Sequence, residues 1–220
     1  MQANDVGRQP GILVAEPGGA QVRTVVLMLP GGQSRSAMRS RRWQLAQLRM
    51  IPFARVAARA TPRGHGVAVW RLQYRLRGWN APRLDPVRDA GWALAEVQRR
   101  HPGARVILVG HSMGGRVVLR CADDPSVIGV CALAPWVEPG EPVDQLAALS
   151  VVIAHGDRDR ITDPRESAIF TERAAAAGAL IRFQVMPGDG HAMVRHAARW
   201  NTVVRDFVTA TVAATAGDAR

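Results

Sequence analysis

Residues 106–119 read Val-Ile-Leu-Val-Gly-His-Ser-Met-Gly-Gly-Arg-Val-Val-Leu, and this stretch decides how the rest of the chain is interpreted. The apolar run 106–109 is typical of a buried strand, and the residues after Gly115 continue as a helix. Between them, Ser112 falls at a sharp strand-to-helix turn. Glycines at 110 and 114 carry no Cβ that would clash there. The pattern predicts a serine hydroxyl that stands clear of the sheet, beside the free N–H groups that begin a helix.

This Gly-His-Ser-Met-Gly segment, with its strand and helix, resembles the nucleophile elbow of the α/β-hydrolase superfamily. The resemblance extends from about residue 12 to about residue 207. It implies a three-layer α/β sandwich with a mostly parallel sheet. Strands that alternate with helices of ordinary length favour the same fold class independently.

Composition indicates one globular domain. A chain of 220 residues buries roughly 70% of its unfolded surface. The formal net charge of +11 comes from arginine alone, because the sequence contains no lysine. The arginines are scattered and do not alternate with aromatic residues. This favours a basic rim that attracts an anionic substrate, or a simple preference for arginine, over nucleic-acid binding.

The N-terminal residues carry neither a basic segment nor an apolar core, and no stretch approaches the length of a membrane span. We therefore expect a cytoplasmic protein with no membrane partner. Cys121 and Cys131 are expected to be buried and reduced. The sequence gives no indication of the oligomeric state.

One domain is expected over residues 12–212, between flexible ends at 1–11 and 213–220. An antiparallel hairpin is predicted from strands 12–15 and 21–29, joined through Pro17-Gly18-Gly19. Further strands are predicted at 67–74, 127–133, 151–154 and 181–186. Helices are predicted at 42–60 with a possible break at Pro52, from 85 or 86 to before 101, at 165–177 and at 193–211.

A serine nucleophile needs a base and a group that orients the base. In the superfamily these follow the serine in the order acid, then histidine. The resemblance assigns the acid to Asp159 in the loop after strand 151–154. Asp157 is the alternative, expected to bond backbone N–H groups, and Asp163 is expected to begin a helix.

The base is assigned to His191, in Gly-Asp-Gly-His after the last predicted strand. His196 is expected to be a surface or packing residue, and His155 to make structural hydrogen bonds. His111 lies within the turn, beside the serine, and is expected to point away from it. The two remaining histidines lie in loops on the wrong side: His65 and His101.

The oxyanion hole is expected to combine the N–H of Met113 with one in the segment Pro30-Gly31-Gly32-Gln33. This segment resembles the family's His-Gly-Gly loop, with Pro30 where histidine is common. Gly32 is the preferred donor and Gln33 the runner-up. An ordinary glycine-rich turn is the alternative interpretation.

The resemblance implies a serine hydrolase that cleaves a carboxylic ester of a small molecule through an acyl-enzyme, with no metal or organic cofactor. A thioesterase or acyltransferase would use the same three residues. A binding protein that has kept the fold without the activity is a third possibility. The chemistry alone does not separate the first two.

Residues 136–149 are too few to form a multi-helix cap, so we expect an open cleft and a small, cap-less hydrolase like the esterases and dienelactone hydrolases. Dienelactone hydrolases use a cysteine nucleophile, so their activity does not carry over. Trp136 is expected either to form a wall of the substrate pocket or to anchor its loop. Trp79 and Arg35 are further candidates for the rim.

Overall fold

The computed structural model describes residues 9–15, 21–60 and 66–217, and its centre is a seven-stranded sheet with the order β1-β3-β2-β4-β5-β6-β7. All pairs from β3 to β7 in this order are parallel, as the alternation of strands with helices in the sequence predicts. The strands are β1 (Gly11–Ala15), β2 (Thr24–Leu29), β3 (Val67–Gln73), β4 (Arg105–His111), β5 (Val127–Leu133), β6 (Ser150–Gly156) and β7 (Leu180–Met186).

The first strand is antiparallel, as predicted, but its partner differs from the prediction. β1 pairs with β3, from Gly11 opposite Gln73 to Ala15 opposite Val69. β2 lies between β3 and β4, so the predicted hairpin of β1 with β2 is wrong. The predicted turn at 17–19 falls outside the described residues.

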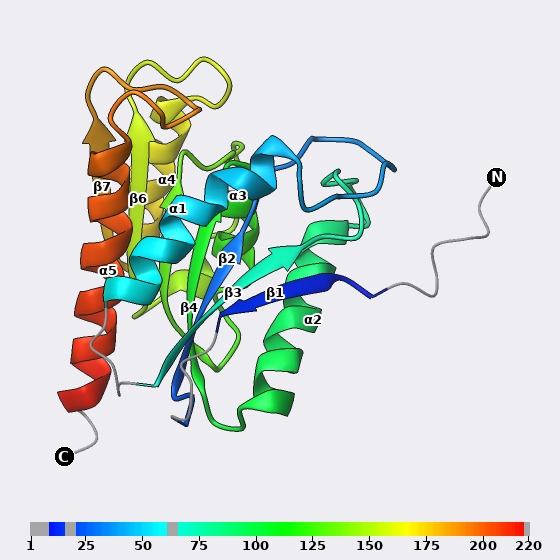
Figure 1. The fold of residues 1–220 in the computed structure, drawn as a ribbon. Helices are drawn as coiled ribbons and strands as arrows, with labels where there is room; N and C mark the ends of the chain where they lie inside the picture. Colours follow the sequence, from blue (N-terminus) through cyan, green and yellow to red (C-terminus); the bar gives the residue numbers. More distant parts are fainter. Residues whose placement is uncertain (1–8, 16–20, 61–65, 218–220) are drawn as a thin grey trace.

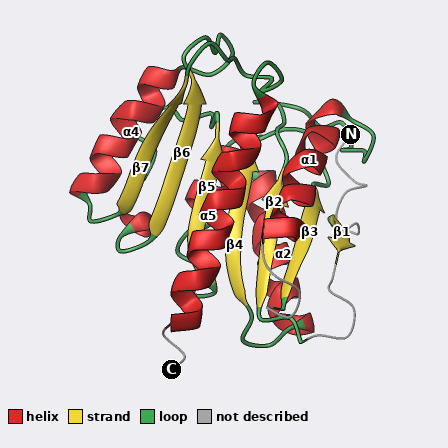
Figure 2. Ribbon diagram, turned by 60° about the vertical axis from the view of Figure 1, so that its left-hand side comes forward, coloured by secondary structure: helices red, strands yellow, loops and turns green. Residues whose placement is uncertain are grey.

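Helices cover both faces of the sheet, which gives the three layers that the sequence predicts (Figure 1). In both views α1 and α5 lie together on one face, while α2, α3 and α4 lie on the other (Figure 2). The helices are α1 (Leu45–Ala60), α2 (Asp85–Arg100), α3 (Met113–Arg120), α4 (Pro164–Ala176) and α5 (Ala197–Gly217).

Each face of the sheet has its own apolar core. Trp70, Leu108 and Phe170 belong to the cluster under α2, α3 and α4. Met50, Cys131 and Trp200 belong to the cluster under α1 and α5. The strands are buried on both faces. Successive side chains along β2, and likewise along β4, therefore belong alternately to one cluster and to the other.

Two helices depart from their predicted bounds. α1 continues through Pro52 without a break. Pro52 and Leu48 are exposed, so water can satisfy the Leu48 carbonyl that loses its intrahelical partner. α5 begins at Ala197, later than predicted, and ends at Gly217, beyond the predicted Thr211. Of the ends predicted to be flexible, 213–217 belong to α5 and Gly11 belongs to β1, while residues 1–8 and 218–220 lie outside the described ranges.

The loops that follow β4, β6 and β7 gather at the carboxyl end of the sheet, where the arrowheads point in Figure 2. Only a short 3-10 helix, η1 (Asp144–Leu146), lies between β5 and β6. The carboxyl edge is therefore not covered by a helical cap at this position. Among the described helices, none has the length and apolar character needed to cross a bilayer.

Candidate active site

Ser112 connects β4 to α3 in a backbone conformation that non-glycine residues rarely adopt, with φ 56° and ψ −119°. Its N–H donates to the Leu133 carbonyl at 3.0 Å, and its own carbonyl accepts from Trp136 at 3.0 Å. A Cβ at Gly110 would overlap the carbonyl of Gly114, and one at Gly114 would overlap the carbonyl of Leu29. The turn thus requires glycine on both sides of the serine, as the sequence motif predicts.

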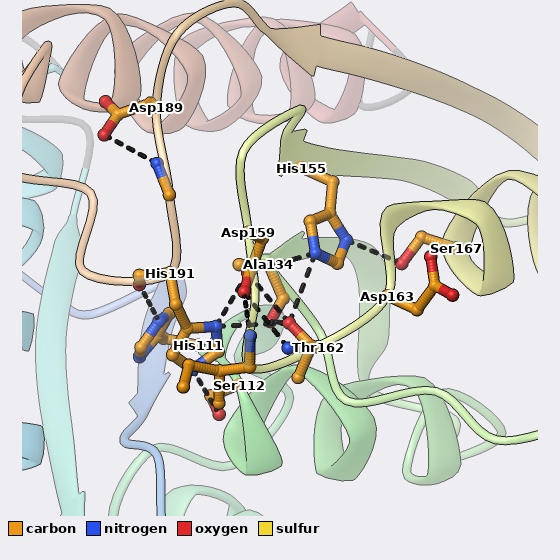
Figure 3. A network of polar contacts seen from close by, with 12 residues as sticks. His111, Ser112, Ala134, His155, Asp159, Thr162, Asp163, Ser167, Asp189 and His191 are labelled. Carbon is orange, nitrogen blue, oxygen red and sulfur yellow. Dashed lines mark hydrogen bonds and ion pairs between the residues drawn. The ribbon is translucent and has the colours of Figure 1, made fainter.

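His191 lies over this turn, in the loop after β7, and faces Ser112 (Figure 3). Its Nε2 is 2.9 Å from Ser112 Oγ, and its Nδ1 is 2.8 Å from Asp159 Oδ2. Ser112 and His191 are both partly exposed, whereas the Asp159 side chain is fully buried. Three side chains from three loops therefore form one continuous Ser-His-Asp arrangement that solvent reaches at its serine end.

Asp159 accepts more hydrogen bonds than its pairing with His191 requires. Its Oδ1 accepts from the N–H groups of Ile161 at 2.8 Å and Thr162 at 3.1 Å, and its Oδ2 accepts from the Thr162 hydroxyl at 2.9 Å. Burial acts to raise the pKa of Asp159, but hydrogen bonds from His155, His191 and these backbone groups outweigh it and hold the pKa well below its usual range. The carboxyl is consequently ionised at neutral pH, as an orienting acid requires.

The competing carboxylates occupy other positions. Asp157 Oδ1 accepts from the Gly188 N–H at 2.7 Å, which links the loops after β6 and β7. Asp163 caps α4 by accepting from the Arg165 N–H at 2.9 Å. Neither contacts His191, so of the three candidates the geometry brings only Asp159 to the imidazole.

His155 lies behind the arrangement, as expected for a structural histidine. Its Nδ1 is 2.8 Å from Ser167 Oγ and its Nε2 is 3.2 Å from Asp159 Oδ2. Asp159 is thus held between two imidazoles, those of His155 and His191 (Figure 3).

His111, which was expected to point away from Ser112, packs on His191, a contact that the sequence did not predict. Its Nε2 lies 3.1 Å from the His191 carbonyl oxygen, and the two rings pack with centroids 4.9 Å apart. Burial, His191 and Arg49 lower the pKa of His111 to about 3. The neutral ring can therefore donate to the carbonyl of the residue that carries the base and hold it in place.

Asp189 fixes the loop that carries His191. Its Oδ1 accepts from the Gly190 N–H at 3.0 Å, and its Oδ2 accepts from the His196 N–H at 3.0 Å and from Trp200 Nε1 at 2.8 Å. Burial acts to raise the pKa of Asp189, but these hydrogen bonds lower it on balance. His196 thus contributes its backbone N–H to the support of the loop, and lies near the start of α5.

Of the two residues expected to provide the oxyanion donors, Gly32 contacts the side chain of Met113. Gly32 packs against the Met113 side chain so closely that a Cβ would overlap its Sδ and Cε atoms and the Arg77 carbonyl. The Gln33 N–H donates to that carbonyl at 2.9 Å and is therefore occupied. The Gly32 N–H has no partner within the described ranges. The geometry favours Gly32 over Gln33 for this role.

Of the predicted substrate-binding residues, Trp79 and Trp136 lie together, whereas Arg35 lies elsewhere. Trp79 is only 3% exposed, so it does not form a rim. Its ring and that of Trp136 enclose the Arg116 guanidinium, at 4.4 and 4.6 Å from the two ring centroids. Arg116 also pairs with buried Glu141 at 2.6 Å. Arg35 is exposed and, with residues 80–83, lines a hollow that includes none of Ser112, Asp159 and His191.

Three contributors to the site went unrecognised in the sequence. Thr162 donates to Asp159, Asp189 holds the loop that carries His191, and His111 packs on the His191 ring. Asp189 is next but one to His191, and Thr162 is three residues after Asp159, so their proximity was visible in the sequence. Their hydrogen bonds depend on loop conformation and could not be inferred from spacing.

The profile of the alpha/beta hydrolase family matches residues 26–154, more than half of the chain. No curated protein sequence matches this chain. Among solved structures, the Butyrivibrio proteoclasticus protein Est1E with bound ferulic acid is 15% identical over 93% of this chain and 96% of that one, with a TM-score of 0.70. The Xanthomonas campestris protein XC6422, a serine hydrolase without a lid, is 20% identical over 90% and 87%, with a TM-score of 0.62. At such identities the likeness concerns the fold alone.

Proposed function

Because this chain belongs to the alpha/beta hydrolase family, as a small member without a cap, we propose that it is a serine hydrolase of carboxylic esters. The observation that carries the proposal is the unbroken path from Ser112 Oγ through His191 to Asp159, with contacts of 2.9 and 2.8 Å. These are the distances at which a base can accept a proton from its nucleophile. Neighbours of the same fold that are described as esterases support the choice of ester substrates, and the neighbour Est1E holds ferulic acid.

In the proposed reaction, Ser112 attacks the ester carbonyl while its proton passes to His191 Nε2. The buried carboxylate of Asp159 stabilises the imidazolium and keeps Nδ1 protonated. The N–H groups of Gly32 and Met113 bind the oxyanion. His191 then protonates the departing alcohol, and water hydrolyses the acyl-enzyme by the same steps. The chemistry needs no metal or organic cofactor.

Labelling with a fluorophosphonate probe tests the proposal directly. The wild-type chain should form a covalent adduct that mass spectrometry locates on Ser112, because only an activated serine reacts. Ser112→Ala should not be labelled. An unreactive wild-type protein would favour a binding protein that retains the fold. Parallel assays with p-nitrophenyl acetate and an acyl-CoA would distinguish an esterase from a thioesterase or acyltransferase.

The identity of the acid is tested by a matched pair of substitutions in one loop. Asp159→Asn should lower kcat by roughly 10³–10⁴-fold, because the amide favours the wrong tautomer of His191. Asp157→Asn removes a carboxylate two residues away that contacts Gly188 instead, so its kcat should stay within about threefold of wild type. The reverse order of effects would overturn the assignment of Asp159.

A further inference from the structure

The loop before α1 and the first turn of that helix expose large apolar side chains. Among the described residues, four of the ten large apolar side chains that are exposed lie within residues 38–48: Met38, Trp43, Leu45 and Leu48. Trp43 is 63% exposed and Leu45 is 76% exposed. In Figure 1 the loop, drawn in blue, projects at the edge of the molecule. Apolar side chains that gather in one exposed segment indicate a contact surface, whereas scattered ones do not.

The same segment is strongly basic. Four of its arginines are exposed: Arg35, Arg39, Arg41 and Arg42. The asymmetry extends along the chain, since residues 17–84 contain thirteen arginines and neither aspartate nor glutamate. All the other residues together contain sixteen arginines and eighteen aspartates and glutamates. The net charge of +11 therefore arises from this part of the sequence.

The basic and the apolar side chains of the segment lie next to one another. The guanidinium of Arg41 lies over the ring of Trp43, 5.2 Å from its centroid. Leu45 and Leu48 are three positions apart on α1, so they lie on the same side of the helix. We call residues 35–48 the basic apolar surface.

This surface adjoins the candidate active site. It follows β2, whose carboxyl end lies at the same edge of the sheet as that of its parallel neighbour β4. Trp43 and Leu45 line a hollow of about 440 Å³ that Gly31 and Gly32 also line. An ideal Cβ on Gly31 would lie 3.3 Å from the Cβ of Ser112. A partner bound to the basic apolar surface is therefore close to the serine.

The chemistry of the surface distinguishes between possible partners. A second copy of the chain, placed symmetrically, would bring the same arginines against one another. A nucleic acid would neutralise the arginines, but its phosphates give no reason for exposed leucines beside them. A bilayer with anionic headgroups attracts the arginines and also takes up tryptophan and leucine side chains below the headgroups. It accounts for both kinds of side chain at once.

We propose that the basic apolar surface docks on a membrane that contains anionic phospholipids. In this arrangement the arginines lie among the headgroups, and Trp43 and Leu45 enter the boundary between headgroups and acyl chains. The expectation of no membrane partner was drawn from the lack of an apolar stretch of spanning length, and docking on a surface requires no such stretch. The docking goes beyond the proposed hydrolase function and does not depend on the nucleophilicity of Ser112.

Sedimentation with lipid vesicles measures the docking. The Ser112→Ala protein is used, so that the esters of the vesicle lipids are not hydrolysed during the measurement. It should bind vesicles of phosphatidylcholine with about 30% phosphatidylglycerol at least about tenfold more tightly than vesicles of phosphatidylcholine alone. Raising NaCl from about 50 to about 500 mM should weaken the binding, because salt screens the arginines from the headgroups.

One pair of substitutions tests the apolar side chains. Trp43→Ser combined with Leu45→Ser should weaken binding to the anionic vesicles at least about tenfold. Both side chains are largely exposed, so thermal unfolding should match that of the parent. Leu180→Ser is the matched control, because Leu180 is 69% exposed but begins β7, at the opposite end of the sheet. Its binding should stay within about twofold of the parent.

A second pair tests the charges. Arg41→Gln combined with Arg42→Gln should weaken binding about 25-fold, because each arginine near an anionic surface contributes about a factor of five. Arg105→Gln is the control, since Arg105 is exposed at the first position of β4, at the amino end of the strand. It should change the affinity by at most about twofold.

No binding to vesicles, equal binding to both kinds of vesicle, or an unchanged affinity after either pair of substitutions would overturn the docking surface. Self-association without vesicle binding would assign the surface to a second copy of the chain, and binding of duplex DNA without vesicle binding would assign it to nucleic acid. Docking by a protein whose wild-type form gives no fluorophosphonate adduct would overturn the proposed function alone. Labelling of Ser112 in a protein that does not dock would overturn the docking surface alone.

Discussion

At the scale of single residues, the site depends on a serine held in an unfavourable backbone conformation. A non-glycine residue at φ 56° and ψ −119° costs roughly 1–3 kcal/mol. Hydrogen bonds to Leu133 and from Trp136 and Arg116 restrain the backbone of Ser112. The neighbouring glycines admit the close approach of α3 to β2. These contacts thus offset the conformational strain of Ser112 and keep its hydroxyl accessible at the turn.

Asp189 gives a prediction for stability and its pH dependence. Asp189→Asn should lower the free energy of unfolding at neutral pH by about 1–3 kcal/mol, because an amide cannot accept from the three N–H donors at Gly190, His196 and Trp200 without placing its own NH₂ against one of them. The folded-state pKa of Asp189 is depressed. Its stabilising contribution is therefore complete above the unfolded pKa of about 4 and is lost as pH falls through the folded value.

Chemical denaturation of both proteins at a series of pH values measures this effect. The difference in unfolding free energy should be constant near neutral pH and shrink under acidic conditions. A difference that widened on acidification would contradict the assigned role of Asp189.

The three candidate residues that the structure brings together could be selected from local sequence. Ser112 could be selected because its glycines and flanking elements are contiguous, and His191 and Asp159 because each follows a strand in the family's order. Trp79 was misplaced because an aromatic residue in a loop sequence does not show whether it is covered by a distant chain segment. Here Arg116, from α3, lies over its ring.

At the scale of elements, an exposed glycine and a closely packed glycine at helical positions predict opposite effects of substitution by alanine on the free energy of unfolding. Gly91 is exposed on α2, and an added Cβ would meet nothing within 4 Å. Gly91→Ala should raise the free energy of unfolding by about 0.5–1 kcal/mol through helix propensity. Gly114→Ala should lower it by about 1–3 kcal/mol, because the methyl would overlap the carbonyls of Leu29 and Pro30.

Urea denaturation of the two variants and wild type provides the comparison. A destabilised Gly91→Ala would mean that the helix surface there contacts another part of the chain. An unaffected Gly114→Ala would mean that α3 can move away from β2 at little cost.

The existence and type of the elements followed from sequence periodicity, but the partner of β1 did not. Two strands adjacent in sequence and joined by Pro-Gly-Gly favour a hairpin locally. In the folded chain β2 is parallel to both neighbours and its two edges are occupied by β3 and β4. β1 therefore pairs with the remaining edge of β3. This choice depends on long-range sheet order, which local patterns do not contain.

At the scale of the whole molecule, the net charge of +11 predicts the response to salt. Excess like charge destabilises a compact chain through self-repulsion. Raising NaCl from about 10 to about 150 mM shortens the screening length from about 30 to about 8 Å. The Tm should therefore rise by a few degrees. Calorimetry at constant pH measures it; a falling Tm would show that local ion pairs such as Arg75–Asp89 outweigh the repulsion.

The short connection between β5 and β6 has a consequence for the fate of the proposed acyl-enzyme. If a cap covered the site, only molecules as small as water could reach the acyl-enzyme once the first product had left. Here the described chain places only η1 between those strands, so dissolved alcohols can approach the acyl carbonyl along with the solvent. The acyl group would then be partitioned between hydrolysis and transfer according to the concentration of each acceptor, and added methanol would divert product from the free acid to its methyl ester.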